Sequence, residues 1–171
     1  VQNGSFFNNM LAPQIGYQAR KELTNKGDRK TYGLPETENL MPSLDPADID
    51  NRRKSYIPGI NEWVEVETVI STTNDYAVAP GSLVRSWEED GRRYFHYKVD
   101  HPSLNFYSSI SADYEVAVNE WNGVDLEVYY HPDHVWNVDN MLRSMRDSLE
   151  YYSENFGPCN HKQARIIEFP R

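Results

Sequence analysis

The segment from Tyr114 to Tyr130 reads YEVAVNEWNGVDLEVYY, and this stretch decides the fold class. Apolar and polar residues alternate on both sides of Asn122-Gly123: Tyr114, Val116 and Val118 precede it, and Val124, Leu126, Val128 and Tyr130 follow it. A period of two indicates strands with one buried face. Asn-Gly tolerates the two positive φ angles of a type I′ turn. We therefore expect an antiparallel hairpin here.

The preceding sequence repeats this pattern. In the stretch 63–70, Val64, Val66, Thr68 and Ile70 fall on one face of an expected strand. A second expected hairpin joins 83–87 to 93–99 through Glu89-Asp90-Gly91, and 104–111 forms one more strand. The middle of the chain is thus predicted to be an antiparallel β-sandwich or a large curved sheet.

Residues 1–60 are irregular, because Gly and Pro interrupt them every few positions. The stretch 19–30 is predicted to hold one or two helical turns. Asp45-Pro46-Ala47-Asp48 is predicted to begin a short helix, with Asp45 as the N-cap residue.

After Pro132 the period changes to that of an amphipathic helix, which begins after Asn137 and ends at Gly157-Pro158. Its apolar stripe is Val138, Met141, Leu142, Met145, Leu149, Tyr152 and Phe156. On its polar face, ion pairs are expected between Arg143 and Asp147 and between Arg146 and Glu150. A last strand is expected at 164–169.

The predicted fold is therefore mainly β, with one long amphipathic α-helix and a terminal strand after the sheets. We expect a β-sandwich-like domain over 1–131, irregular over 1–60 and with regular strands over 61–131. The range 132–171 would be a linker, a helix and a strand of a second unit. Because the chain begins at Val1 and ends at Arg171 directly after a strand-like run, we expect it to be a segment of a larger protein.

The net charge of the chain is −9. Such a surface repels phosphate backbones, and the short basic clusters at 52–54 and 92–93 do not offset it, so a nucleic-acid partner is not expected. Cys159 is the only cysteine, which excludes an internal disulfide. No stretch of the sequence has the roughly 20 apolar residues of a membrane span, so no membrane contact by this segment is expected.

No motif for catalysis or metal binding is found. His131 and His134 are separated by Pro132, which argues against the helical spacing of a metal pair, and we interpret them as exposed residues of a loop that follows a strand. The sequence has no His-Glu-x-x-His run. We therefore predict no catalytic, cofactor-binding or metal-ligating residue in this chain.

Four further patterns do not indicate a site. The tyrosines at 107, 114, 129, 130, 151 and 152 could line a ligand groove, but the cores of sheets and helices routinely contain aromatic side chains. The aspartates at 45, 48 and 50, with Asn51, lack the Gly and Glu of a calcium loop. Cys159 and His161 lie too close in sequence for a pair that converges from distant segments. Asn3-Gly4-Ser5 matches the glycosylation pattern, which short sequences often match by chance.

The last third of the chain nevertheless resembles a known family. Val124 to Pro132, the helical run LEYYSENFGP at 149–158, Lys162 and the strand ending Glu168-Phe169-Pro170 resemble the zinc aminopeptidases of the aminopeptidase N type. Cys159-Asn160 stands where members usually have Tyr-Pro. Asn3-Gly4-Ser5-Phe6, Pro13 to Tyr17 and Tyr32 to Pro35 look like a bacterial branch in which such a domain is fused to an ABC-transporter permease.

In that family, this region comprises the N-terminal β-domain and the start of a thermolysin-like catalytic domain. The resemblance implies that the zinc ligands and the general-base Glu lie in a missing catalytic domain, so zinc is not expected in this chain. That domain of the same polypeptide is the expected partner, with a peptide as a possible substrate. The expected setting is the soluble, extracytoplasmic part of a bacterial membrane protein. The alternative is a β-sandwich module that binds a protein or peptide for a transporter and has no hydrolytic activity.

Overall fold

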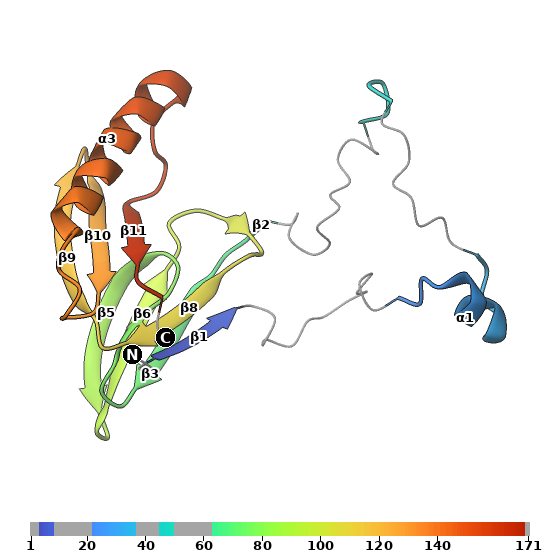
Figure 1. Cartoon of the computed structure of the whole chain (residues 1–171), viewed down its shortest axis with the longest axis horizontal. Helices are drawn as coiled ribbons and strands as arrows, with labels where there is room; N and C mark the ends of the chain where they lie inside the picture. The colour runs from blue at the N-terminus through green and yellow to red at the C-terminus, as the bar shows by residue number, and fades with distance from the viewer. Residues whose placement is uncertain (1–3, 9–21, 37–44, 50–62, 170–171) are drawn as a thin grey trace.

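The protein was analysed as a computed structural model that describes residues 4–8, 22–36, 45–49 and 63–169 (Figure 1). The fold is mainly β, with antiparallel sheets, one long helix and a terminal strand, which confirms the predicted class. The elements are β1 (Gly4–Asn8), α1 (Lys26–Thr31), β2 (Trp63–Val64), β3 (Glu67–Thr72), β4 (Tyr76–Val78), β5 (Ser82–Glu89), β6 (Arg92–Lys98), β7 (Ser103–Leu104), β8 (Ser108–Ala112), β9 (Glu115–Trp121), β10 (Val124–Tyr130), α3 (Val138–Phe156) and β11 (Gln163–Ile167).

The two predicted hairpins are confirmed. Strands β9 and β10 pair antiparallel around Asn122 and Gly123, whose φ angles are 48° and 79°. Strands β5 and β6 pair antiparallel around Asp90 and Gly91, whose φ angles are 50° and 71°. In both turns two successive residues adopt positive φ, so the local sequence accounts for the chain reversal. The inward face of β9 was only partly predicted, because Val118 is 63% exposed.

Two of the predicted strands are each divided between sheets. The stretch 63–70 forms β2, which pairs with β7, and then β3, which pairs with β6. Between them the Val66 carbonyl accepts a hydrogen bond from the Val99 N–H at 3.0 Å. Likewise, 104–111 contributes to β7 and, after a break, to β8. Alternation alone did not reveal these breaks because the side-chain period continues through them.

Strands β1 and β4 were not predicted, and both pair antiparallel with β8, one on each side. Successive residues of β4 contribute to different cores. Ala77 packs with Phe95 and Tyr97 of β6, whereas Val78 packs with Ile110 of β8 and Tyr129 of β10. This short strand therefore lies between the sheet β3-β6-β5 and the sheet β11-β10-β9, and it is covered on both faces.

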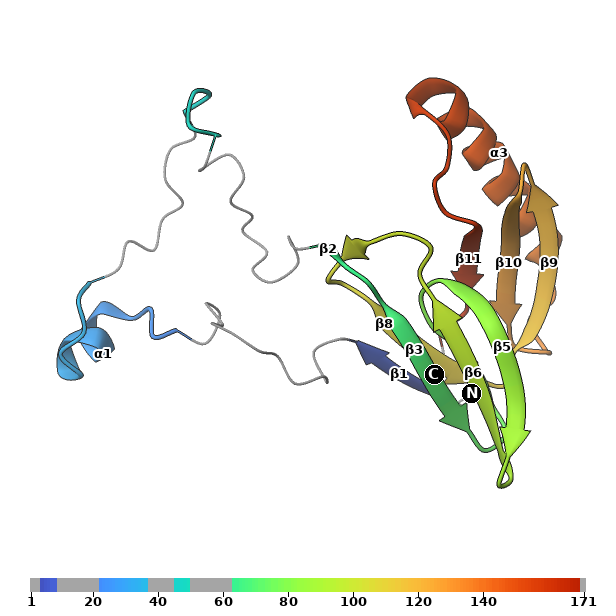
Figure 2. The ribbon, with the colours of Figure 1, turned by 180° about the vertical axis from the view of Figure 1, so that it is seen from behind.

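The C-terminal unit is β10–α3–β11, in which β11 pairs parallel to β10. Figure 2 shows α3 lying along the sheet β11-β10-β9, and its contacts are with β10 and β9. The helix ends at Gly157, where φ is 111°, as expected. Asn137 precedes the helix but its side chain makes no capping hydrogen bond. The predicted boundary at residue 131 stays a prediction, and the β10–β11 ladder runs across it.

Neither ion pair expected on the polar face of α3, Arg143 with Asp147 or Arg146 with Glu150, is formed among the described residues. Arg146 forms its ion pair with the adjacent Asp147, at 2.8 Å, rather than with Glu150. Both side chains are about half exposed, so solvent screens the pair and its contribution to stability is small.

In the N-terminal region, the predicted helical turns correspond to α1. Its N-cap residue is Asn25, whose Oδ1 accepts hydrogen bonds from the N–H groups of Gly27 and Asp28 at 2.8 and 3.2 Å. Residues 45–48 form a turn in which Asp45 Oδ1 accepts from the Ala47 N–H at 2.9 Å. Asp50, Asn51 and the sequence pattern at Asn3 lie outside the described residues.

Candidate functional site

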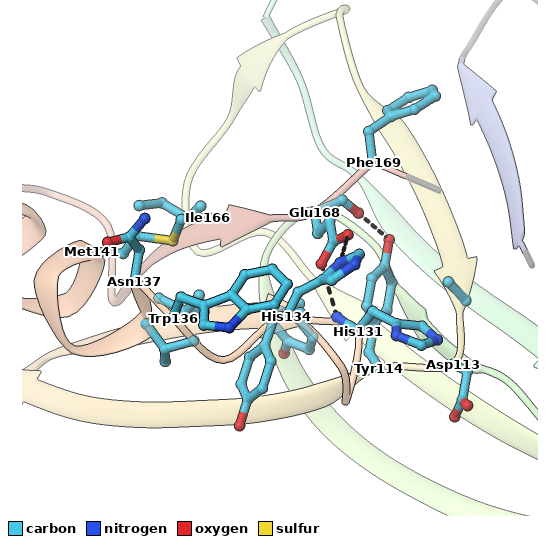
Figure 3. Close-up of a pocket in the computed structure, with 15 residues that line it drawn as sticks. Asp113, Tyr114, His131, His134, Trp136, Asn137, Met141, Ile166, Glu168 and Phe169 are labelled. Atoms are coloured by element: carbon cyan, nitrogen blue, oxygen red, sulfur yellow. Dashed lines mark hydrogen bonds and ion pairs between the residues drawn. The ribbon is translucent and has the colours of Figure 1, made fainter. Parts of the chain in front are cut away.

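A cavity of about 660 Å³ lies where β10 and β11 end, beside the first turn of α3 (Figure 3). Ligands of open α/β sheets commonly bind at the carboxyl ends of parallel strands, which is where this cavity is found. Its lining residues come from β8, β10, β11, α3 and the adjoining loops. They are Ala112, Asp113, Tyr114, Val128, Tyr129, Tyr130, His131, His134, Trp136, Asn137, Val138, Met141, Ile166, Glu168 and Phe169.

Glu168, directly after β11, makes hydrogen bonds to several segments that line the cavity. Its carboxylate accepts the His131 backbone N–H at 2.9 Å through Oε2 and contacts His134 Nδ1 at 2.5 Å through Oε1. Its carbonyl oxygen accepts the Tyr114 hydroxyl at 2.5 Å, and its own N–H donates to the Tyr129 carbonyl at 2.9 Å. One residue therefore ties the start of β9, the end of β10 and the loop before α3 to the end of β11.

These contacts shift the pKa of the Glu168 carboxyl and of the Tyr114 hydroxyl. Partial burial raises the pKa of the Glu168 carboxyl, but the hydrogen bond from the His131 N–H and the contact with His134 outweigh it, and the net pKa is lowered. Glu168 is therefore an anion at neutral pH. Burial, and then the negative charges of Glu168 and Asp75, raise the pKa of Tyr114 to about 12, so its hydroxyl remains a donor.

Aromatic rings form one wall of the cavity. The ring centroids of His131 and His134 are 5.3 Å apart, and those of His134 and Trp136 are 5.4 Å apart. Trp136 is 76% exposed, so much of its ring is free to contact a ligand. Figure 3 shows the three rings following one another along the loop between β10 and α3.

The structure corrects the interpretation of the histidine pair. His131 and His134 do lie in a loop after a strand, but the His131 side chain is only 17% exposed and His134 is paired with Glu168. Within the described residues, no group of three or more His, Cys, Asp or Glu side chains is arranged to hold a metal ion. The described residues therefore do not fit a zinc centre.

Cys159 and His161 do not line this cavity. Cys159 Sγ contacts the backbone carbonyl of His161 at 3.5 Å, not its imidazole, so the geometry is not that of a thiol–imidazole pair. Of the tyrosines at 107, 114, 129, 130, 151 and 152, three line the cavity: Tyr114, Tyr129 and Tyr130. Tyr129 is 2% exposed, and its role is mainly in the core.

A second cavity of about 540 Å³ lies on the other face of β11, against β4 and β8. Gln163, Arg165 and Ile167 line it, whereas Ile166 and Glu168 line the first cavity. Alternate residues of β11 thus face opposite cavities, as the pleat of a strand requires.

The sequence indicates Tyr114 only as one of several tyrosines that could line a groove, and it does not indicate Glu168 as a site residue. Glu168 lies at the end of an apolar run, and nothing in its neighbours indicates four hydrogen-bonding partners. The partners come from positions as far as 54 residues away, so only the fold brings them together.

The comparison with solved structures indicates which architecture this is. An aminopeptidase A of Legionella pneumophila, solved in complex with aspartic acid, matches with a TM-score of 0.55 at 13% identity. The matched part of this chain has the fold of a part of that protein. The match covers 63% of this chain but only 14% of the aminopeptidase. No protein family matches the sequence, and no curated protein does either.

No helix among the described residues is long and apolar enough to cross a membrane.

Proposed function

We propose that this chain is the β-domain and the first elements of the catalytic domain of an aminopeptidase-like zinc metalloprotein. Its role is structural: it packs on the rest of the catalytic domain and shapes the peptidase cleft. The observation that carries the proposal is the likeness in fold between 63% of this chain and part of a solved aminopeptidase, with a TM-score of 0.55. No catalytic role is assigned to any residue of this chain.

The uncovered half of α3 supports the proposal. Val138 is buried, and Leu142, Met145 and Leu149 are half-buried against the sheet. Beyond them Tyr151, Tyr152 and Phe156 are 58%, 59% and 76% exposed. We call these three residues the α3 aromatic patch. Large aromatic side chains gathered on one exposed surface are typical of a surface that another domain covers.

The edge of β11 supports it as well. The Asp125 N–H donates to the Lys162 carbonyl and the Glu168 N–H donates to the Tyr129 carbonyl, each at 2.9 Å. In a parallel ladder the bonding residues alternate, so the backbone groups of Gln163, Arg165 and Ile167 point away from β10. No described strand pairs with this edge. An open edge of this kind accepts a further strand of a larger sheet.

The setting is part of the same proposal. The larger polypeptide is proposed to be a bacterial membrane protein in which this domain is extracytoplasmic and joined to an ABC-transporter permease. The zinc ion and its ligands are proposed to lie in the remaining part of the catalytic domain. A peptide is the proposed substrate of the assembled protein.

The test is to produce this chain and the rest of the catalytic domain as two separate polypeptides. We expect them to associate, and the double substitution Tyr152→Lys with Phe156→Lys to weaken that association. The control is Val118→Lys, which changes another exposed apolar residue, on β9. Zinc content and cleavage of aminoacyl chromogenic substrates are measured for the chain alone and for the pair.

We expect zinc and cleavage only in the pair. Association without zinc and without cleavage would favour instead a β-sandwich module that binds a protein or peptide for a transporter. A pair that does not associate, or stoichiometric zinc on this chain alone, contradicts the proposal.

A further inference from the structure

The charged side chains that line the cavity between β10, β11 and α3 are mainly carboxylates. Among its described lining residues, Asp113 and Glu168 are acidic and none is Lys or Arg. Three more carboxylates stand next to it: Asp133 beside His131, Glu115 bonded to the Tyr130 hydroxyl at 3.2 Å, and Asp139 in the first turn of α3. The positive end of the helix dipole amounts to about half a charge, so carboxylates dominate this surface.

The carboxylates differ in how far they are engaged. Both carboxylate oxygens of Glu168 already have partners, the His131 N–H and His134, so Glu168 is less available to a ligand cation. Asp113 is exposed, and Figure 3 shows it beside His131, at the other end of the row of rings from Trp136. No ion pair engages its side chain among the described residues, so a ligand cation at that end of the cavity has one available carboxylate.

The aromatic wall favours the same kind of ligand. Trp136 presents most of its ring to solvent, and the hydroxyl-bearing rings of Tyr114 and Tyr130 belong to the same cavity. The faces of aromatic rings carry negative electrostatic potential and attract ammonium groups. Val138, Met141 and Ile166 supply an apolar floor. Pockets of about 300 to 1,000 Å³ accommodate small organic ligands, and this cavity is within that range.

We propose that this cavity binds a small organic ammonium ion with an apolar body, held by Trp136 and Asp113. The inference goes beyond the proposed function, which assigns no ligand to this chain. The ammonium group could belong to a free amine or to the amino end of a peptide. Both present the same chemistry to the cavity.

The test uses isothermal titration calorimetry on the 171-residue chain with 2-phenylethylamine as the probe. The matched comparison is 2-phenylethanol, which has a similar shape and no charge. We expect the amine to bind at least about fivefold more tightly, since a cation over an aromatic face accounts for a difference of this order. Phenylalanyl-glycine amide and its N-acetyl form separate the two sources: a peptide amine binds only in the free form.

Substitutions place the ligand in the cavity. Trp136→Ala and Asp113→Asn alter exposed side chains and are each expected to weaken amine binding about threefold or more. Trp63→Ala and Asp147→Asn are controls, because Trp63 is also exposed and Asp147 lies on the polar face of α3, and they should leave it unchanged. Circular dichroism verifies folding of each variant.

Equal binding of the amine and the alcohol, or no binding of the amine, overturns the proposal even if a variant fails to fold. Unchanged affinity in both Trp136→Ala and Asp113→Asn overturns it as well. These results are independent of whether the chain associates with a catalytic domain. Failure of the proposed function and failure of this inference are therefore distinguishable.

Discussion

Arg165 and Gly81 lie 84 positions apart in the sequence, yet Nη1 of Arg165 donates to the Gly81 carbonyl oxygen at 2.6 Å. The same nitrogen donates to the Ala79 carbonyl at 3.1 Å, and Nε forms an ion pair with the Glu127 carboxylate. Both charged side chains are largely buried. This guanidinium therefore joins β11 and β10 to the connection between β4 and β5, which belongs to the other sheets.

Replacing Arg165 with Leu should strongly destabilise the fold. The substitution leaves the Glu127 carboxylate buried without its partner and frees two backbone carbonyls. Removing one member of a buried ion pair lowers the free energy of unfolding by about 3 to 5 kcal/mol. Urea unfolding followed by circular dichroism measures the change.

The control for this prediction is Arg146→Leu, which removes an exposed pair on α3. Exposed pairs contribute about 1 kcal/mol or less, so this variant should be nearly as stable as the parent chain. The double variant Arg165→Leu with Glu127→Gln should recover part of the loss, because the isolated charge is gone. Equal effects of Arg165→Leu and Arg146→Leu would contradict the assigned role.

Gly81 itself should tolerate no side chain. Its φ is +91°, and a Cβ built there lies 2.1 Å from the Lys98 carbonyl oxygen. Gly91 is the matched control: its φ is +71°, but nothing lies within 4 Å of its Cβ position. We expect Gly91→Ala to lower the free energy of unfolding by about 1 to 2 kcal/mol from the positive φ alone, and Gly81→Ala to lower it further. Thermal unfolding of both variants at one pH measures the two losses of stability. Similar losses in Gly81→Ala and Gly91→Ala would show that the close approach of the Lys98 carbonyl to Gly81 is unimportant.

The parts of the fold that the sequence predicts are those with local causes. Asn122-Gly123 fixes its turn through two residues that tolerate positive φ. The three- and four-residue spacing of α3 predicts the helix and the part of its apolar stripe, from Val138 to Leu149, that packs on the sheet, whereas Tyr152 and Phe156 of the same stripe are exposed. The parts of the fold that the sequence does not predict depend on contacts between residues far apart in the chain. In β11 the neighbouring Ile166 and Ile167 obscure the period of two, so the sequence does not reveal that Arg165 turns inward.

The candidate site was harder to predict for the same reason. The loop position of His131 and His134 follows from Pro132, but their environment depends on Glu168, which arrives only after α3 folds back and β11 pairs parallel to β10. Strand β4 was also not predictable from the local sequence. A segment of three residues carries too little pattern to be assigned, although its neighbours bury both faces.

Stability should depend on pH through Glu168. Its folded-state pKa is below the ordinary 4.5, so its contribution is present above that value and is lost as the pH falls through the folded-state pKa. The parent chain should therefore be more stable than Glu168→Gln at pH 7, and the difference should shrink as the pH is lowered below 4.5.

Urea unfolding of both proteins at several pH values tests this. Glu150→Gln, on the polar face of α3, is the control for the loss of one negative charge. A difference between parent and Glu168→Gln that stays constant down to pH 3, or grows in acid, would mean that the carboxylate contacts with His131 and His134 do not stabilise the fold.

The α3 aromatic patch should cause the isolated chain to self-associate. Tyr152 and Phe156 have ring centroids 5.8 Å apart and are mostly exposed, so they form a continuous apolar surface that water solvates poorly. Sedimentation velocity should show a weight-average mass that rises with concentration. Phe156→Glu should reduce this rise without changing the unfolding midpoint, because the ring is 76% exposed and contributes little to the fold. Val118→Glu places the same charge on an exposed site of β9 and should not reduce it. A parent chain that remains monomeric at every concentration would mean that this patch does not drive association, and would count against its assignment as the surface that a second domain covers.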